Sequence, residues 1–164
     1  MDAITLEVMR NRFFAITEEM GAALIRTAYS TNIKDRRDCS CALFDVNGET
    51  IAQAEHIPVH SGVLPWGVKG ALKHINKKEL KPGDAIMHND PFIGGTHLPD
   101  IIIFSPIFFK GELVAFVGNL GPSEWFRRWC IQDCLQAEKC YSCRRGILFS
   151  CQLFHAVCLQ YRYP

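Results

Sequence analysis

The sequence predicts an α+β fold in which a mixed, mainly antiparallel sheet follows an N-terminal amphipathic helix. Apolar residues recur at spacings of three and four over about residues 4–29, which is the helical period. Asn47-Gly48 separates two short apolar segments, as in a β-hairpin. Two dense apolar segments, 101–109 and 112–118, flank Lys110-Gly111 and predict a second antiparallel pair.

The composition is that of one ordinary globular domain. The chain has 164 residues, of which 48% are hydrophobic and 21% charged, with a formal net charge of +1. This charge gives no reason to expect nucleic acid or an anionic membrane as a partner. We also expect neither a transmembrane helix nor a secretory signal, because no apolar run approaches the necessary length and the first residues lack a basic region.

The first helix is expected to begin after Asp2, which can cap it, and to pack on the core. Glu18 and Glu19 fall on its solvated side. The apolar stripe consists of Leu6, Met9, Phe13, Ile16, Met20, Leu24 and Ala28.

A polar connection, residues 30–40, should join this helix to strands at 41–44 and 50–54. This connection contains the charged residues Arg36, Arg37 and Asp38. They either bind a carboxylate or phosphate group or are solvated surface charges. Cys39 and Cys41 are expected to be reduced thiols that pack as small hydrophobes.

Two histidines, His56 and His60, come next, with Pro58 between them. Pro58 argues against a helix here. In an extended segment the two side chains would stand about 13 Å apart, too far to chelate one ion. Either one of them lies at a site, or each has its own partner.

Residues 61–76 are predicted to form a helix with Pro65 in its first turn and Lys77 at its end. A turn at 80–84 and a short strand at 85–87 follow. The apolar density of 101–118 suggests a sheet that is covered on both faces.

The segment 88–100, His-Asn-Asp-Pro-Phe-Ile-Gly-Gly-Thr-His-Leu-Pro-Asp, concentrates the ligand-type residues. A tight turn can bring His97 and Asp100 onto one side to share a divalent ion. Asp90 would then be a further ligand, an orienting residue or a general base, and the N–H groups of Gly94-Gly95 could hold an oxyanion. In the alternative reading, the two aspartates cap local turns and His97 is hydrogen-bonded within the loop.

This segment, from residue 89 to 100, resembles the signature of the hydantoinase B family, which includes the C-terminal part of 5-oxoprolinase and the alpha subunit of acetone carboxylase. Further similar strings occur in the same order at 4–8, 19–24, 33–45 and 52–60. The similarity runs without gaps over residues 1–119.

The resemblance implies a cytoplasmic, ATP-dependent enzyme that opens five-membered lactams of the hydantoin or 5-oxoproline type at a metal-bearing site. ATP would be bound by a hydantoinase A-type partner subunit, which phosphorylates the substrate carbonyl oxygen, and not by this chain. The ion would be manganese- or zinc-like, or magnesium. The implied site residues are His97 and Asp100 as metal ligands, Asp90 with His56 or His60 for proton transfer, and Asn89, Gly94, Gly95 and Thr96 for substrate binding.

The chain departs from the family after Asn119. The family has a further histidine in a segment resembling Asn-x-x-His-His-x-Asp-Val-Gly-Gly, and that histidine would fall near Pro122. Six of the eight cysteines lie in residues 120–164. We expect a reading-frame shift here; the alternatives are a metal or disulfide module around Cys140-x-x-Cys143 and a divergent C-terminus.

The sequence therefore predicts two parts. Residues 1–119 would be the incomplete N-terminal portion of a larger hydantoinase B/oxoprolinase fold, and residues 120–164 an atypical tail. Such a fragment is expected to be inactive alone. An acetone carboxylase-type alpha subunit and a non-catalytic remnant that at best binds its A-type partner are the alternative functions.

Overall fold

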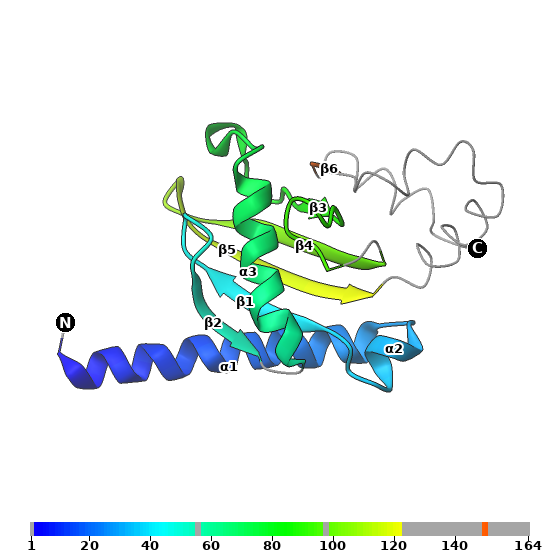
Figure 1. The fold of residues 1–164 in the computed structure, drawn as a ribbon. Coiled ribbons are helices and arrows are strands. Elements are labelled where there is room, and N and C mark those ends of the chain that lie inside the picture. Colours follow the sequence, from blue (N-terminus) through cyan, green and yellow to red (C-terminus); the bar gives the residue numbers. More distant parts are fainter. Residues whose placement is uncertain (1, 55–56, 97–98, 123–148, 151–164) are drawn as a thin grey trace, which may run out of the picture.

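The computed structural model describes residues 2–54, 57–96, 99–122 and 149–150. Its strands form one sheet in the order β2-β1-β5-β4-β3-β6, and every neighbouring pair is antiparallel. The α+β prediction is confirmed (Figure 1). The elements are α1 (Ala3–Thr27), α2 (Thr31–Lys34), β1 (Ser40–Phe44), β2 (Thr50–Ala54), α3 (Pro58–Leu72), the 3₁₀ turn η1 (Lys77–Glu79), β3 (Ile86–His88), β4 (Asp100–Phe109), β5 (Glu112–Pro122) and β6 (Phe149–Ser150).

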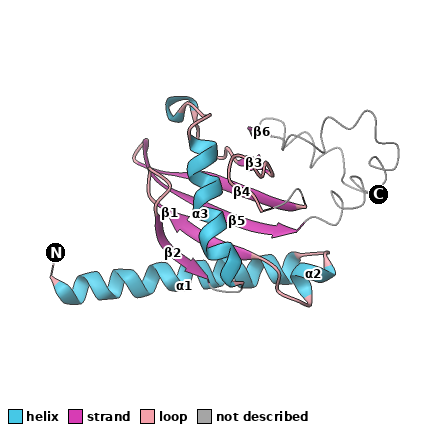
Figure 2. Ribbon diagram, viewed as in Figure 1, coloured by secondary structure: helices cyan, strands magenta, loops and turns pink. Residues whose placement is uncertain are grey.

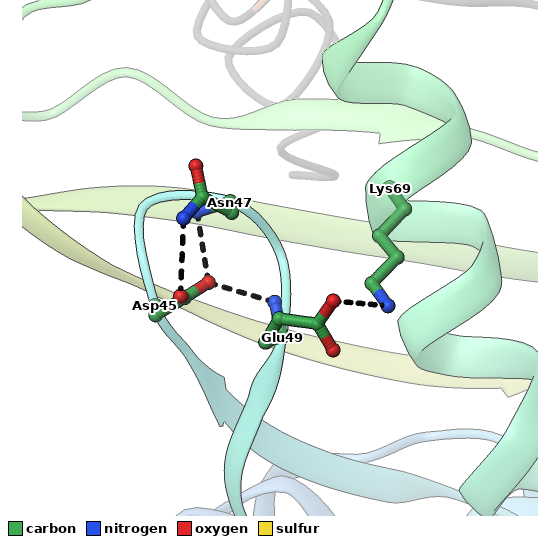
Figure 3. A network of polar contacts seen from close by, with 4 residues as sticks. All are labelled: Asp45, Asn47, Glu49 and Lys69. Atoms are coloured by element: carbon green, nitrogen blue, oxygen red, sulfur yellow. Dashed lines mark hydrogen bonds and ion pairs between the residues drawn. The ribbon is translucent and has the colours of Figure 1, made fainter.

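The predicted hairpin at Asn47-Gly48 is confirmed and is closed by a small polar network (Figure 3). Asp45 Oδ1 accepts hydrogen bonds from the backbone N–H groups of Asn47 and Glu49, each at 2.8 Å. Gly48 supplies the positive φ of +83° that the turn needs. Lys69 on α3 pairs with Glu49 at 2.7 Å, which ties the turn to the helix.

The second predicted pair, β4 with β5, is also confirmed, with Lys110 and Gly111 at positive φ in its turn. Burial alternates along β4, as it does when one face is packed and the other is not. Among the described residues, the second face of β4 and β5 is only partly buried, whereas β1 of the same sheet is buried at every position.

The packed face lies beneath α3, which crosses the sheet (Figure 2). Phe104 and Phe116 meet edge to face there, with ring centroids 5.8 Å apart. The buried cluster consists of Ala42, Phe44, Leu64, Val68, Ala71, Leu72, Ile86, Ile102, Phe104, Phe116 and Leu120.

Helix α1 begins where expected, since Asp2 Oδ1 accepts from the Thr5 N–H at 2.8 Å. The expectation that its whole apolar stripe packs on the core is wrong. Residues 3–12 are all exposed, and Leu6 is 60% exposed, because this half of the helix projects beyond the sheet (Figure 1). Burial falls instead on Thr17 and Gly21, where α1 packs against β1 and β2.

The region around Pro58 differs from the prediction of an extended segment. Helix α3 begins at Pro58, whose missing N–H costs nothing in the first turn, and Pro65 lies inside the helix. His60 is therefore helical, while His56 lies outside the described residues. The helix ends at Leu72, so residues 77–79 form a separate 3₁₀ turn.

Two further findings complete the fold. The connection 30–40 contains a short helix, α2, that the sequence did not predict. In the described ranges, none of the helices is long and apolar enough to cross a membrane. Apart from residues 120–122 in β5 and 149–150 in β6, the predicted tail, including Cys140 and Cys143, lies outside the described residues.

Candidate active site

The candidate site lies at the end of the sheet where β4 begins and β5 ends. Asp100 is the first residue of β4 and pairs with Pro122, the last residue of β5. On the other side of β5, Ser40 at the start of β1 pairs with Leu120. The beginnings of β1 and β4 therefore flank the end of β5.

Asp90 shapes the loop that precedes β4. Its backbone carbonyl accepts hydrogen bonds from the N–H groups of Ile93, Gly94 and Gly95, and its Oδ1 accepts from the Phe92 N–H at 2.8 Å. Asp90 thus caps a local turn, as one of the two sequence readings expected. An oxyanion at Gly94-Gly95 would have to compete with this carbonyl for their N–H groups.

The same loop packs closely on α3 through glycines. A Cβ on Gly70 would lie 1.9 Å from the Ile93 carbonyl oxygen, and one on Gly67 would lie 2.7 Å from that of Gly94. Gly94 has a φ of +149°, which favours glycine. The Gly94 backbone therefore approaches a helix, and this contact fixes the loop at the sheet end.

Asp100 is buried and hydrogen-bonded. The hydroxyl of Thr96 donates to its Oδ2 at 2.5 Å, and only 5% of Asp100 is exposed. Asn89, predicted to bind substrate, is also buried. The loop between β3 and β4, together with the first residue of β4, thus contains four of the predicted site residues: Asn89, Asp90, Thr96 and Asp100.

His60 lies in the first turn of α3 and contacts β1. Its Nδ1 is 3.2 Å from Ser40 Oγ, and its Nε2 is 3.7 Å from Asp38 Oδ1. Sequence reasoning noted Asp38 only as a surface or anion-binding charge and did not single out Ser40. Little in the sequence indicated the contact between Ser40 and His60, because 20 residues separate them.

His88, the last residue of β3, is another residue that the sequence analysis did not assign. It is fully buried beside Gly67, and in the described part of the chain neither ring nitrogen has a hydrogen-bond partner. Burial lowers the pKa of His88, against opposing effects of the Gly67 backbone and the Asp90 charge. The imidazole is therefore held neutral.

Over residues 2–54, 57–96, 99–122 and 149–150, no group of three His, Cys, Asp or Glu side chains is placed to hold a metal ion. His97 lies outside these ranges. Of the two predicted metal ligands, the structure describes the position of Asp100. Its carboxylate oxygens are ligands that a divalent ion accepts. A complete site would need His97 and at least one further ligand.

The comparison with known proteins decides the family. The hydantoinase B/oxoprolinase sequence pattern matches residues 2–122, about three quarters of the chain. The chain belongs to this family. It is 47% identical over 120 residues to 5-oxoprolinase 1 of Arabidopsis thaliana, covering 73% of the chain and 9% of that protein.

Two solved structures share the fold. An ATP-dependent caprolactamase from Pseudomonas jessenii matches with a TM-score of 0.64 and 35% identity, over 74% of this chain and 21% of that one. A nucleotide-free acetone carboxylase matches with a TM-score of 0.66 and 23% identity, over 74% and 16%. The chain therefore spans about a fifth or less of the length of these relatives.

Proposed function

We propose that this hydantoinase B-family chain carries part of the active site of an ATP-dependent cyclic-amide hydrolase that opens five-membered lactams. The observation that carries the proposal is the loop 89–100, which holds the buried carboxylate of Asp100 at the sheet end with Thr96 donating to it. Relatives named 5-oxoprolinase and caprolactamase support a cyclic amide as substrate.

The metal ligands proposed are His97 and Asp100. Asp100 fits this role because its carboxylate oxygens are ligands that a divalent ion accepts, and because only 5% of the residue is exposed at this end of the sheet. A manganese- or zinc-like ion, or magnesium, would polarise the substrate carbonyl when bound. ATP would be bound by a hydantoinase A-type partner subunit in the same cytoplasmic complex.

Proton transfer would be assisted by Asp90, with His56 or His60. The loop residues Asn89, Gly94, Gly95 and Thr96 would contact the substrate. The tight turn around the Asp90 carbonyl supports this assignment, because it keeps the loop in one conformation.

The test is ring opening in a reconstituted complex. The full chain is mixed with a hydantoinase A-type subunit, ATP, Mn²⁺ and 5-oxoproline, hydantoin or caprolactam, and the ring-opened product and ADP are measured. Product formation that requires both subunits supports the proposal. The chain without its partner is expected to be inactive, because no ATP-binding role is assigned to it.

A second candidate function is a non-catalytic role in which the chain only binds its A-type partner. Pro122 favours this candidate, because it stands directly opposite Asp100, close to where the family has a histidine. Complex formation without any product would support it over the first. An acetone carboxylase-type role is tested with acetone and bicarbonate in the same mixture; the likeness to that enzyme supports the fold alone.

A further inference from the structure

Two neighbouring arginines, Arg36 and Arg37, lie at the end of the sheet that carries the candidate site. They stand between α2 and Ser40, the first residue of β1, and β1 pairs with β5. On the other side of β5, Asp100 at the start of β4 pairs with the last residue of β5. The starts of β1 and β4 are two strand spacings, or roughly 10 Å, apart. The arginine pair and Asp100 therefore flank the same strand end, beside α2 (Figure 1).

The corner that carries the arginines is fixed against β5. The Arg37 N–H donates to the Ile33 carbonyl oxygen at 3.1 Å. The Asp38 N–H donates to the Asn32 carbonyl oxygen at 3.0 Å. The position of a Cβ on Gly121 in β5 lies 3.3 Å from Ile33 Cδ1 and 3.6 Å from the Asp38 carbonyl oxygen. The backbone of the arginine pair is thus held in one place relative to the strand end.

Both arginine side chains are exposed. In the described part of the chain, no carboxylate forms an ion pair with either guanidinium group. The neighbouring Asp35 is exposed, and the Asp38 carboxylate lies 3.7 Å from His60 Nε2. The fork of N–H donors on each guanidinium is therefore open to an oxyanion, which it can bind through two parallel hydrogen bonds.

The backbone of this corner gives no reason for arginine and leaves no N–H group for an anion. Arg37 has a φ of +55°, a conformation that glycine adopts at lower cost. The N–H groups of Arg37, Asp38 and Cys39 already donate to carbonyl oxygens. An oxyanion at this corner would therefore be bound by the arginine side chains.

We propose that Arg36 and Arg37 bind an oxyanion of the substrate and so help to set its position at the candidate site. This inference rests on the proposed lactam-opening function. The oxyanion is either the carboxylate of an acidic lactam such as 5-oxoproline or the phosphoryl group that the A-type subunit adds to the carbonyl oxygen. Hydantoin and caprolactam carry no carboxylate, so comparison of the three lactams separates the two sources.

The first experiment measures binding and needs no partner subunit. Side-chain Nε–H signals are recorded in ¹H–¹⁵N spectra of the full chain while sodium phosphate or 5-oxoproline is added at constant ionic strength. Arg36→Gln and Arg37→Gln assign the two signals, and we expect them to shift and saturate with at least one probe. Arg12 and Arg26, exposed arginines on α1, are internal controls whose signals should not shift. Saturable shifts at neither Arg36 nor Arg37 overturn the inference.

The second experiment measures ring opening in the complex with the A-type subunit. Arg36→Gln with Arg37→Gln should lower kcat/KM about 10- to 100-fold, as expected when charged hydrogen bonds to a ligand are lost. A loss confined to 5-oxoproline identifies the carboxylate, and a loss shared by all three lactams identifies the phosphoryl group. Arg36→Lys with Arg37→Lys should recover part of the rate, because lysine keeps the charge but not the fork.

The control and the contradicting outcomes keep the two proposals apart. Arg12→Gln removes an exposed arginine far from this corner and should leave the rate unchanged, and equal urea midpoints show that all variants fold. An active complex in which the double glutamine variant matches Arg12→Gln with every lactam overturns the inference while the proposed function stands. If the unchanged complex opens no lactam, the proposed function fails, and the binding spectra alone then decide the inference.

Discussion

His88 illustrates how one residue can couple stability to pH. Burial lowers its pKa below the ordinary 6.5, so the unfolded chain binds a proton more readily than the folded one. The stability that neutral His88 contributes is fully present above pH 6.5 and is lost as the pH falls through its lower folded pKa.

We therefore expect His88→Met to reduce the loss of stability between about pH 7.5 and pH 5. Urea unfolding midpoints at the two pH values measure this effect. His74→Gln, which changes an exposed histidine, is the control and should leave the pH dependence as it is. An identical pH dependence in His88→Met would show that the buried imidazole does not contribute.

The buried thiol of Cys41 gives a second prediction at this scale. Burial, followed by the charges of Cys39 and Glu18, raises its pKa to about 12. Since the thiolate is the reactive form, Cys41 should be alkylated by iodoacetamide far more slowly in the folded chain than in urea. Peptide mass spectrometry follows the residue; equal rates in both states would contradict the burial of this strand.

At the scale of elements, the contact between α3 and the loop before β4 depends on glycine. Gly70→Ala would place a Cβ 1.9 Å from the Ile93 carbonyl oxygen, so the helix or the loop must move. We expect a loss of about 1–3 kcal/mol in unfolding free energy, measured with urea. Gly62→Ala is the matched control on the same helix, because a Cβ there meets nothing within 4 Å, and it should be neutral or stabilising.

The pairing of β4 with β5 makes a prediction about metal binding. Pro122 is the cross-strand neighbour of Asp100, so Pro122→His would place an imidazole beside the proposed ligand. We expect Mn²⁺ or Zn²⁺ to bind about tenfold more tightly in this variant, measured by calorimetry. Asn119, which pairs with Ile103, lies three residues before Pro122 on β5, so its side chain points to the other face and Asn119→His should have no effect. Equal affinities in all three chains would argue against a metal at Asp100.

At the scale of the whole molecule, the described residues include an exposed apolar segment in the first half of α1. Ile4 is 79% exposed and Leu6 60%, and Val8 and Ile16 are exposed on the same helix. Apolar residues at this density on a projecting helix favour self-association. We expect the mass measured by analytical ultracentrifugation to rise with concentration, and Ile4→Lys with Leu6→Lys to abolish the rise. Arg12→Gln, an exposed polar change on α1, should not alter it.

Local patterns predicted most of the elements. The Asp2 cap, the Asn47-Gly48 hairpin and the β4–β5 pair each follow from a few neighbouring residues, because capping and turn formation are short-range effects. The same local rule failed at Pro58, where a proline taken as a helix breaker opens α3. For the site, the sequence located the loop around Asp90 but not the link between Ser40 and His60, which are 20 residues apart.

The sequence by itself determined the family, the antiparallel hairpins and the concentration of ligand-type residues in 88–100. Only the tertiary structure decided which side chains meet. It buried His88, placed Pro122 opposite Asp100, and set Asp38, Ser40 and His60 against one another. The physical reason is that strand register and helix crossing bring distant residues together through packing of the whole core, which no local pattern encodes.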